Sequence, residues 1–215
     1  MADLRMIMYN SAPIWVQNVL TTVQGAALAR RRYGAVYRSY LRELGGRDHS
    51  NALEQKQYQD QRFVELVNYA VANSPFYRDY YASIDLTSIE GVQDIARLPI
   101  LPKETVRRNI GQLYTLPRDE GIVSNTSGTT GTSISFVHTQ GDMQKRLAYL
   151  DSFKARHGFI ANKMRRASFT TAKIVPRGQR ARVFWRDNLS IRQRLYSGYH
   201  CRGSNVKHYV ENLNE

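Results

Sequence analysis

The sequence predicts an α/β protein in which a helical N-terminal region is followed by an incomplete α/β sheet domain. Two observations indicate this order. Apolar residues recur at helical spacing through roughly the first hundred residues, whereas short segments of alternating apolar and polar residues begin after Asp119. We therefore expect a helical region over residues 1–115 and a partial α/β region over residues 116–215.

Composition and charge indicate a folded, basic protein. The 215 residues are 42% hydrophobic and 23% charged, which is typical of globular chains. The formal net charge of +13 admits nucleic acid, anionic lipid or polyphosphate as partners and selects none of them. The single cysteine, Cys201, excludes an internal disulfide and favours a reducing, cytoplasmic location. We expect Cys201 to be an ordinary structural thiol.

The segment from Pro13 to Arg31 is expected to form an amphipathic helix, with the proline in its first turn. Four apolar residues share one side of this helix: Val16, Leu20, Val23 and Ala27. We expect that side to pack onto the protein's own core, and contact with a membrane surface is the alternative. Residues 6–29 carry no charge but include many amides and hydroxyls, so we predict no transmembrane segment.

Further helices are expected before residue 115. One buried helix face is indicated by the spacing of Phe63, Leu66, Val67, Ala70 and Val71. Asn73-Ser74-Pro75 ends that helix, because the residue before a proline avoids the α region. A short aromatic helix follows, then an extended connector over residues 98–102 and another short helix over residues 103–110.

The second half is expected to alternate strands and helices. Residues 121–124 and 134–138 are expected strands on either side of a polar loop, and a helix follows over residues 142–156. Later strands are expected at residues 167–171 and 195–199. A final helix over residues 206–213, capped by Ser204, is expected to leave the sheet cut part-way through, because no closing strand follows it.

The polar loop over residues 124–135 holds four serines, four threonines and two glycines, without a charged side chain. Gly128 and Gly131 permit positive φ, so that successive backbone N–H groups can converge on an anion. Hydroxyl donors surround them: Ser127, Thr129, Thr130 and Thr132. Such a loop holds phosphate with dipoles alone, and Mg²⁺ would supply the missing positive charge.

Other glycine-rich nucleotide-binding motifs and a flexible surface loop are the alternatives to this interpretation. The Walker A pattern is excluded because no lysine follows either glycine, and the dinucleotide fingerprint G-x-G-x-x-G is absent. A flexible surface loop is the alternative that composition alone leaves open. Its position between two expected strands favours a rigid phosphate cradle.

The loop also carries a family resemblance. Residues 126–132, TSGTTGT, resemble the phosphate-binding signature of the adenylate-forming superfamily, which includes acyl-CoA synthetases. Three flanking segments are similar to its phenylacetate–CoA ligase-like branch, which includes CapK-type proteins of capsular polysaccharide biosynthesis: residues 69–77, 98–104 and 195–200. Ser133 departs from this pattern, because the family usually has proline there.

The resemblance implies the N-terminal half of an AMP-forming ligase with the adenylate-forming fold. In that reaction a carboxylate attacks the α-phosphate of ATP, and CoA or another acceptor then takes the acyl group. The implied cofactors are ATP and Mg²⁺. The implied ATP phosphate-binding residues are Thr126, Ser127, Gly128, Thr129, Thr130, Gly131 and Thr132. Catalytic residues cannot be identified in this chain, so we expect it to be inactive alone.

Two alternatives to the ligase function are consistent with the sequence. Six arginines between residues 177 and 194 alternate with Phe184, Trp185 and Tyr196, as in non-catalytic basic modules that stack single-stranded nucleic acid. No nucleic-acid motif accompanies them, so no specific nucleic acid is expected. An inactive, truncated gene product is the other alternative.

Residues near the loop and the histidines offer little further chemistry. The five histidines match no zinc-binding spacing, and no metal site is expected. We expect His138 to be a strand-end polar residue, with an approach to a bound ligand as the alternative. Asp142 is expected to stabilise a helix N-terminus, and positioning a metal is its alternative role.

Overall fold

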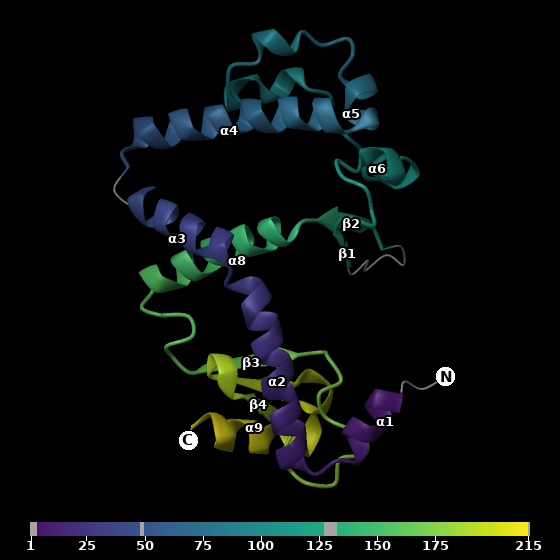
Figure 1. The fold of residues 1–215 in the computed structure, drawn as a ribbon, viewed down its shortest axis with the longest axis vertical. Helices are drawn as coiled ribbons and strands as arrows, with labels where there is room; N and C mark the ends of the chain where they lie inside the picture. The colour runs from purple at the N-terminus through teal and green to yellow at the C-terminus, as the bar shows by residue number, and fades with distance from the viewer. Residues whose placement is uncertain (1–3, 48–49, 127–132, 215) are drawn as a thin grey trace. The chain divides into compact units, whose positions relative to one another are not determined.

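The computed structural model describes residues 4–47, 50–126 and 133–214 and is a mixed α/β protein, as predicted (Figure 1). The chain forms two compact units. Unit 1 comprises residues 1–37 and 147–215, and unit 2 comprises residues 38–146. The chain passes between the units inside two helices, α3 (Ala35–Arg47) and α8 (Gln140–Arg156). The expected boundary near residue 115 falls within unit 2, where helices give way to the first strand.

Unit 2 is mainly helical, as expected. Its helices are α4 (Ala52–Asn73), α5 (Pro75–Tyr80), α6 (Lys103–Arg108) and α7 (Ile110–Leu113), with 3₁₀ turns at Leu86–Ser88 and Val92–Arg97. The predicted break at Ser74 is confirmed, because this fully buried residue ends α4 and caps α5. Its hydroxyl accepts from the Tyr77 N–H and donates to the Gln112 carbonyl, 2.8 Å away.

The expected buried face of α4 is only partly correct. Val67 is buried, but Leu66 is 64% exposed. The start of α4 is fixed by a capping box, in which the Asn51 side chain accepts from the Glu54 N–H and Glu54 accepts from the Asn51 N–H. This local device sets where the helix begins independently of the apolar pattern.

A two-stranded antiparallel hairpin completes unit 2. Strands β1 (Ile122–Asn125) and β2 (Ser135–His138) pair with Ile122 opposite His138 and Asn125 opposite Ser135. Both strands were predicted, β2 from its apolar–polar alternation. They place the two ends of the polar loop side by side.

Unit 1 contains a three-stranded mixed sheet with helices on both faces (Figure 1). The strands β3 (Arg166–Thr170), β4 (Trp185–Asn188) and β5 (Gln193–Ser197) lie in the order β3-β5-β4, with β5 parallel to β3 and antiparallel to β4. Its helices are α1 (Leu4–Ser11), α2 (Ile14–Arg32) and α9 (Val206–Leu213), besides the second part of α8.

Several of these elements were not expected from the sequence. The expected strands at residues 167–171 and 195–199 are confirmed as β3 and β5, whereas β4, α1 and α3 were missed. The prediction that Ser204 caps the last helix is wrong, because Asn205 holds that position and no side-chain capping bond forms. A 3₁₀ turn at Gly203–Asn205 precedes α9 and takes up the residues expected to form its cap.

One face of the sheet carries the aromatic core of unit 1. Phe184, Tyr196 and Tyr209 of α9 are buried and pack together, with Val175 beside them. The Tyr209 hydroxyl donates to the Ser197 carbonyl, 2.7 Å away, which fixes α9 on the end of β5. Burial, with a smaller contribution from Cys201, raises the pKa of Tyr209 to about 12.

The other face of the sheet is covered by α2, and here the predicted packing is wrong. The buried residues of α2 are Gln17, Thr21 and Gly25, whereas Leu20 and Val23 are 46% and 62% exposed. The strand beneath presents Arg186 and Asn188, whose polar groups need hydrogen-bond partners. Polar and small residues of α2 therefore face the sheet, and the apolar side faces outward.

Close approach of α2 to β4 depends on a glycine. A Cβ atom added at Gly25 would lie 2.2 Å from the Asn188 side-chain nitrogen, so no larger residue fits without displacement. Asn18 and Thr22 accept from the backbone N–H groups of Asp187 and Leu189, at 3.0 and 3.2 Å. None of the described helices combines the length and apolar character needed to cross a bilayer.

Candidate functional site

The structure describes the base of the predicted phosphate loop. At the ends of the loop, the Thr126 N–H donates to the Ile134 carbonyl at 2.9 Å, and the Ile134 N–H donates to the Thr126 hydroxyl oxygen at 3.0 Å. The Ser133 hydroxyl donates to the Thr126 carbonyl. Together these bonds form the loop neck, defined as Thr126, Ser133 and Ile134, which holds both ends of the loop together.

Most of the predicted phosphate-binding residues lie outside the described residues: Ser127, Gly128, Thr129, Thr130, Gly131 and Thr132. Thr126 is the described member of the set. Its hydroxyl oxygen accepts the bond that closes the neck, so its structural contribution is to shape the loop. In the adjacent residue pair of the hairpin, the Ser135 hydroxyl donates to the Asn125 side-chain oxygen at 2.6 Å, which also holds the two strands together.

His138 lies on the hairpin next to Ser124. The ring Nδ1 is 3.2 Å from the Thr139 carbonyl oxygen, and Nε2 is 3.0 Å from the Ser124 hydroxyl. A carbonyl oxygen can only accept, so Nδ1 donates to Thr139, and Nε2 shares its hydrogen bond with the Ser124 hydroxyl. This confirms His138 as a strand-end polar residue, bonded within the hairpin.

Asp142 lies in the first turn of α8 and stabilises its N-terminus together with Thr139, as the sequence predicted. Its carboxylate accepts from the Thr139 N–H at 2.9 Å, and the Asp142 N–H donates to the Thr139 hydroxyl at 3.0 Å. Burial opposes the ionised form, but the hydrogen bonds from Thr139 outweigh this effect and hold the pKa of Asp142 below its ordinary value. The described residues contain no group of three or more His, Cys, Asp or Glu arranged to hold a metal ion.

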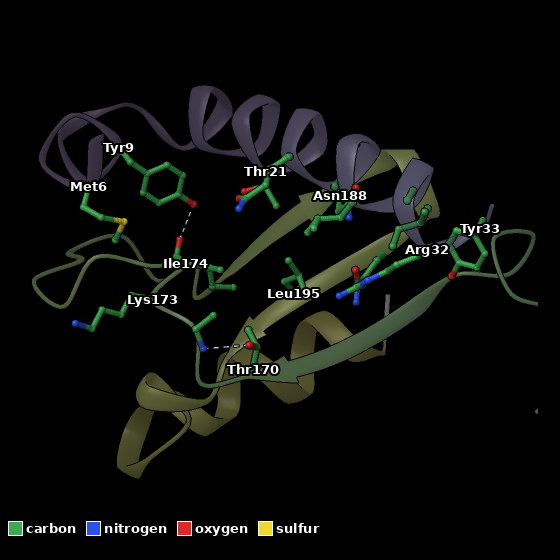
Figure 2. Close-up of a pocket in the computed structure, with 17 residues that line it drawn as sticks. Met6, Tyr9, Thr21, Arg32, Tyr33, Thr170, Lys173, Ile174, Asn188 and Leu195 are labelled. Atoms are coloured by element: carbon green, nitrogen blue, oxygen red, sulfur yellow. Dashed lines mark hydrogen bonds between the residues drawn. The ribbon is translucent and has the colours of Figure 1, made fainter. Parts of the chain in front are cut away.

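Unit 1 contains a pocket of about 380 Å³ between α1, α2 and the sheet (Figure 2). Its apolar lining comes from Met6, Leu28, Ile174, Ile191 and Leu195. Figure 2 shows Arg32 and Tyr33 at one end and Met6 and Lys173 at the other. The described lining contains two charged residues, Arg32 and Lys173, and both are cationic.

A long-range hydrogen bond closes one wall of this pocket. The Tyr9 hydroxyl donates to the Ile174 carbonyl, 2.7 Å away, and joins α1 to the segment after β3 (Figure 2). The sequence did not predict the pocket, because these residues are 165 positions apart and neither belongs to a motif. An apolar floor with a few polar groups is typical of small-molecule sites.

Arg186 in β4 is a fully buried cation of unit 1 whose hydrogen-bond partners in the described part of the chain are neutral. Its Nε donates to the Gln17 side-chain oxygen at 2.6 Å, and its terminal nitrogens donate to the Val183 and Trp185 carbonyls and to Gln179. Burial lowers the pKa of Arg186, and a hydrogen bond with Tyr9 opposes that shift.

The arginine–aromatic segment, for which nucleic-acid stacking was the alternative interpretation, mostly lies inside unit 1. Phe184 and Tyr196 are 5% and 2% exposed, so their faces cannot stack with bases. Arg194 pairs with both carboxylate oxygens of Asp187, at 2.7 and 3.3 Å, and Arg186 is interior. Base stacking on these two rings is therefore excluded. Cys201 is a half-buried free thiol packed against the same core, as expected.

The fold and the loop define a mixed α/β protein that carries a hydroxyl-rich loop on a hairpin. No protein-family model matches the chain. It is 35% identical over 208 residues to Protein CapK of Staphylococcus aureus, an alignment that covers 96% of this chain and 45% of the relative. The expected resemblance to CapK is thereby confirmed, and the chain spans less than half the length of this relative.

Proposed function

We propose that this chain is the ATP-binding, N-terminal part of an adenylate-forming ligase that acts in capsular polysaccharide biosynthesis. The sequence of residues 126–132 and the hydrogen-bonded loop neck support ATP phosphate binding. The similarity to Protein CapK supports the role in capsule biosynthesis. The acyl substrate is a carboxylate, and the acceptor is CoA or another nucleophile.

In this proposal the chain contributes positioning and charge stabilisation. Bound ATP, with Mg²⁺, supplies the α-phosphate that the carboxylate attacks and pyrophosphate as the leaving group. Backbone N–H groups and hydroxyls of residues 127–132 hold the phosphates and stabilise the negative charge that develops on the leaving group. Thr126 shapes the loop from its neck.

The observation that carries the proposal is the pairing at the loop neck. A phosphate cradle needs its N–H donors to be oriented before the ligand arrives, because reorganisation would reduce the gain from binding. The bonds between Thr126 and Ile134 fix both ends of the loop at one point of the hairpin. A Ser/Thr/Gly segment between unpaired ends would lack that support.

A calorimetric titration with Mg²⁺·ATP tests phosphate binding. Gly128→Asp places a carboxylate against the phosphates, and like-charge contact costs several kcal/mol, so Kd should rise by more than about a hundredfold. Gly46→Asp is the matched control, because it adds the same charge at an exposed position of α3 where a side chain has open space. Equal affinity of the wild-type chain and Gly128→Asp contradicts the proposal.

A non-catalytic basic binding function is the second candidate. It is favoured by the location of the charge: unit 1 holds 18 of the 31 Lys and Arg residues but 5 of the 18 Asp and Glu residues. The remaining 13 basic and 13 acidic residues of unit 2 cancel, so the whole net charge of +13 belongs to unit 1. Salt-dependent binding of an anionic surface that ATP does not affect would favour this candidate.

A further inference from the structure

The outward face of α2 is apolar along its length. Trp15, Val19 and Val23 follow one another at intervals of four residues and are 69%, 53% and 62% exposed, with Leu20 beside them. We call these four residues the α2 stripe. No charged residue interrupts α2 between Ile14 and Ala29. An apolar face of this length on a folded domain marks a binding surface.

The opposite side of the helix explains why the stripe cannot turn inward. Gln17 is hydrogen-bonded to buried Arg186, and Asn18 and Thr22 bond to the backbone of β4 and the turn after it. Rotating α2 to bury the stripe would remove the acceptor of the Arg186 Nε–H group in the interior, which is unfavourable. The polar contacts therefore hold the apolar face outward.

The charge around the stripe is positive. Residues 4–37 contain four arginines and no Asp or Glu. Arg30 is exposed and lies two helical turns after Val23, on the same side of α2 as the stripe. Arg31 and Arg32 follow it and end the helix. Since the net charge of the protein belongs to unit 1, the field around this face attracts anions.

We propose that the α2 stripe binds an anionic lipid bilayer surface, with α2 lying in the plane of the headgroups. Apolar side chains along one side of a helix enter the boundary between headgroups and acyl chains, and neighbouring arginines contact lipid phosphates. Trp15 suits the end of such a surface, because an indole ring is favoured at the membrane interface. A polypeptide partner would fit the apolar residues but would leave the basic surroundings unexplained.

Trp15 itself reports on the proposed contact. The chain has two tryptophans, and the other, Trp185, lies in β4 on the aromatic face of the sheet. In a Trp185→Phe background, Trp15 fluorescence is measured with vesicles of phosphatidylcholine mixed with phosphatidylglycerol, and with phosphatidylcholine alone. We expect a blue shift and quenching by brominated acyl chains with the anionic vesicles, weakening as salt rises.

Two pairs of variants separate the stripe from general surface properties. Val19→Gln with Val23→Gln should lower the vesicle partition coefficient by at least about tenfold. Its control is Leu66→Gln with Ile100→Gln, which changes two exposed apolar residues of unit 2 and should leave binding unchanged. Arg30→Gln should weaken binding, whereas Arg108→Gln in unit 2 should not.

Specific outcomes would overturn the proposal. These are Trp15 emission unchanged by anionic vesicles, or equal partition of the stripe variant and its control. Equal binding to neutral vesicles would also overturn it. A blue-shifted Trp15 without lipid, in a complex larger than a monomer by light scattering, would assign the stripe to a polypeptide contact instead. Circular dichroism of each variant should match the wild-type spectrum, which checks that the fold is intact.

Discussion

The Arg186 guanidinium donates to the Gln17 side-chain oxygen across 2.6 Å, and both residues are buried. This bond joins residues 169 positions apart and determines which side of α2 faces the sheet. It places a cation in the interior of unit 1 with neutral partners, and it leaves the apolar side of α2 exposed.

Replacing Gln17 with leucine should destabilise the protein by about 2–3 kcal/mol, because the buried guanidinium loses an acceptor. Urea unfolding followed by circular dichroism measures the change. Gln24→Leu is the matched control, since Gln24 is an exposed residue of the same helix and its replacement should change stability by less than about 0.5 kcal/mol. Similar unfolding midpoints for the two variants would contradict the role assigned to Gln17.

Two glycine-to-alanine substitutions should have opposite effects. Gly25→Ala places a Cβ against the Asn188 side chain and should cost about 1–3 kcal/mol, because α2 must move away from β4. Gly46→Ala, in open space on α3, should stabilise the protein by about 0.5–1 kcal/mol through higher helix propensity. Thermal unfolding distinguishes them, and a shift of the same sign in both would disprove the close packing at Gly25.

Asp142→Asn should remove part of the acid dependence of stability. The folded pKa of Asp142 is lowered, so its contribution is complete above the ordinary value of 3.8 and is lost as pH falls through the folded pKa. At neutral pH the free energy of unfolding of the variant should be about 1 kcal/mol lower than that of the wild type, because the helix N-terminus is less well capped. Urea unfolding at several pH values should show that the difference in unfolding free energy between the variant and the wild type shrinks below pH 3.8. A difference that does not change with pH would contradict the lowered pKa of Asp142.

Thr126→Val should weaken ATP binding while the fold is kept. The substitution removes the hydroxyl that accepts from the Ile134 N–H, and a bond of this kind contributes about 1 kcal/mol, or roughly a fivefold change in Kd. Thr115→Val in the same unit is the control, because its hydroxyl accepts a long hydrogen bond of 3.4 Å from the exposed Tyr69 hydroxyl. Unchanged affinity in Thr126→Val would separate the neck from the proposed site.

The 215-residue chain alone should not catalyse carboxylate-dependent exchange of pyrophosphate into ATP. The chain aligns with 45% of its relative, and its sequence offers no candidate catalytic residue for adenylation. Radiolabelled pyrophosphate with a panel of aliphatic and aromatic carboxylates provides the measurement. Exchange above a Gly128→Asp control would show that the chain completes adenylation by itself.

Local signals in the sequence predicted much of the fold. Alternation over residues 134–138 indicated β2, and the steric restriction before Pro75 ended α4 at Asn73. Strand β4 was missed because an arginine in the sequence normally indicates a surface position. Arg186 is buried only because the fold places Gln17 of α2 next to it as an acceptor. The same contact explains why the outward side of α2 was misassigned, since helical spacing identifies a face but not the partner that it packs against.

Of the two candidate ligand sites, the sequence predicted the loop but not the pocket. The loop was visible in the sequence because its composition and its flanking strands are contiguous. The pocket of unit 1 was not, because its wall depends on the bond between Tyr9 and the Ile174 carbonyl. Neither residue has a neighbour in sequence that indicates a ligand.

The central claim, that residues 126–132 hold the phosphates of ATP, is tested most directly by NMR on a chain labelled with ¹⁵N-glycine. The chain has 14 glycines, among them Gly128 and Gly131 in the loop and Gly25 at the pocket of unit 1. We predict that Mg²⁺·ATP and Mg²⁺·pyrophosphate shift the amide signals of Gly128 and Gly131, whereas adenosine does not. Shifts confined to Gly25, or no shift in the loop at saturating ATP, would contradict the account.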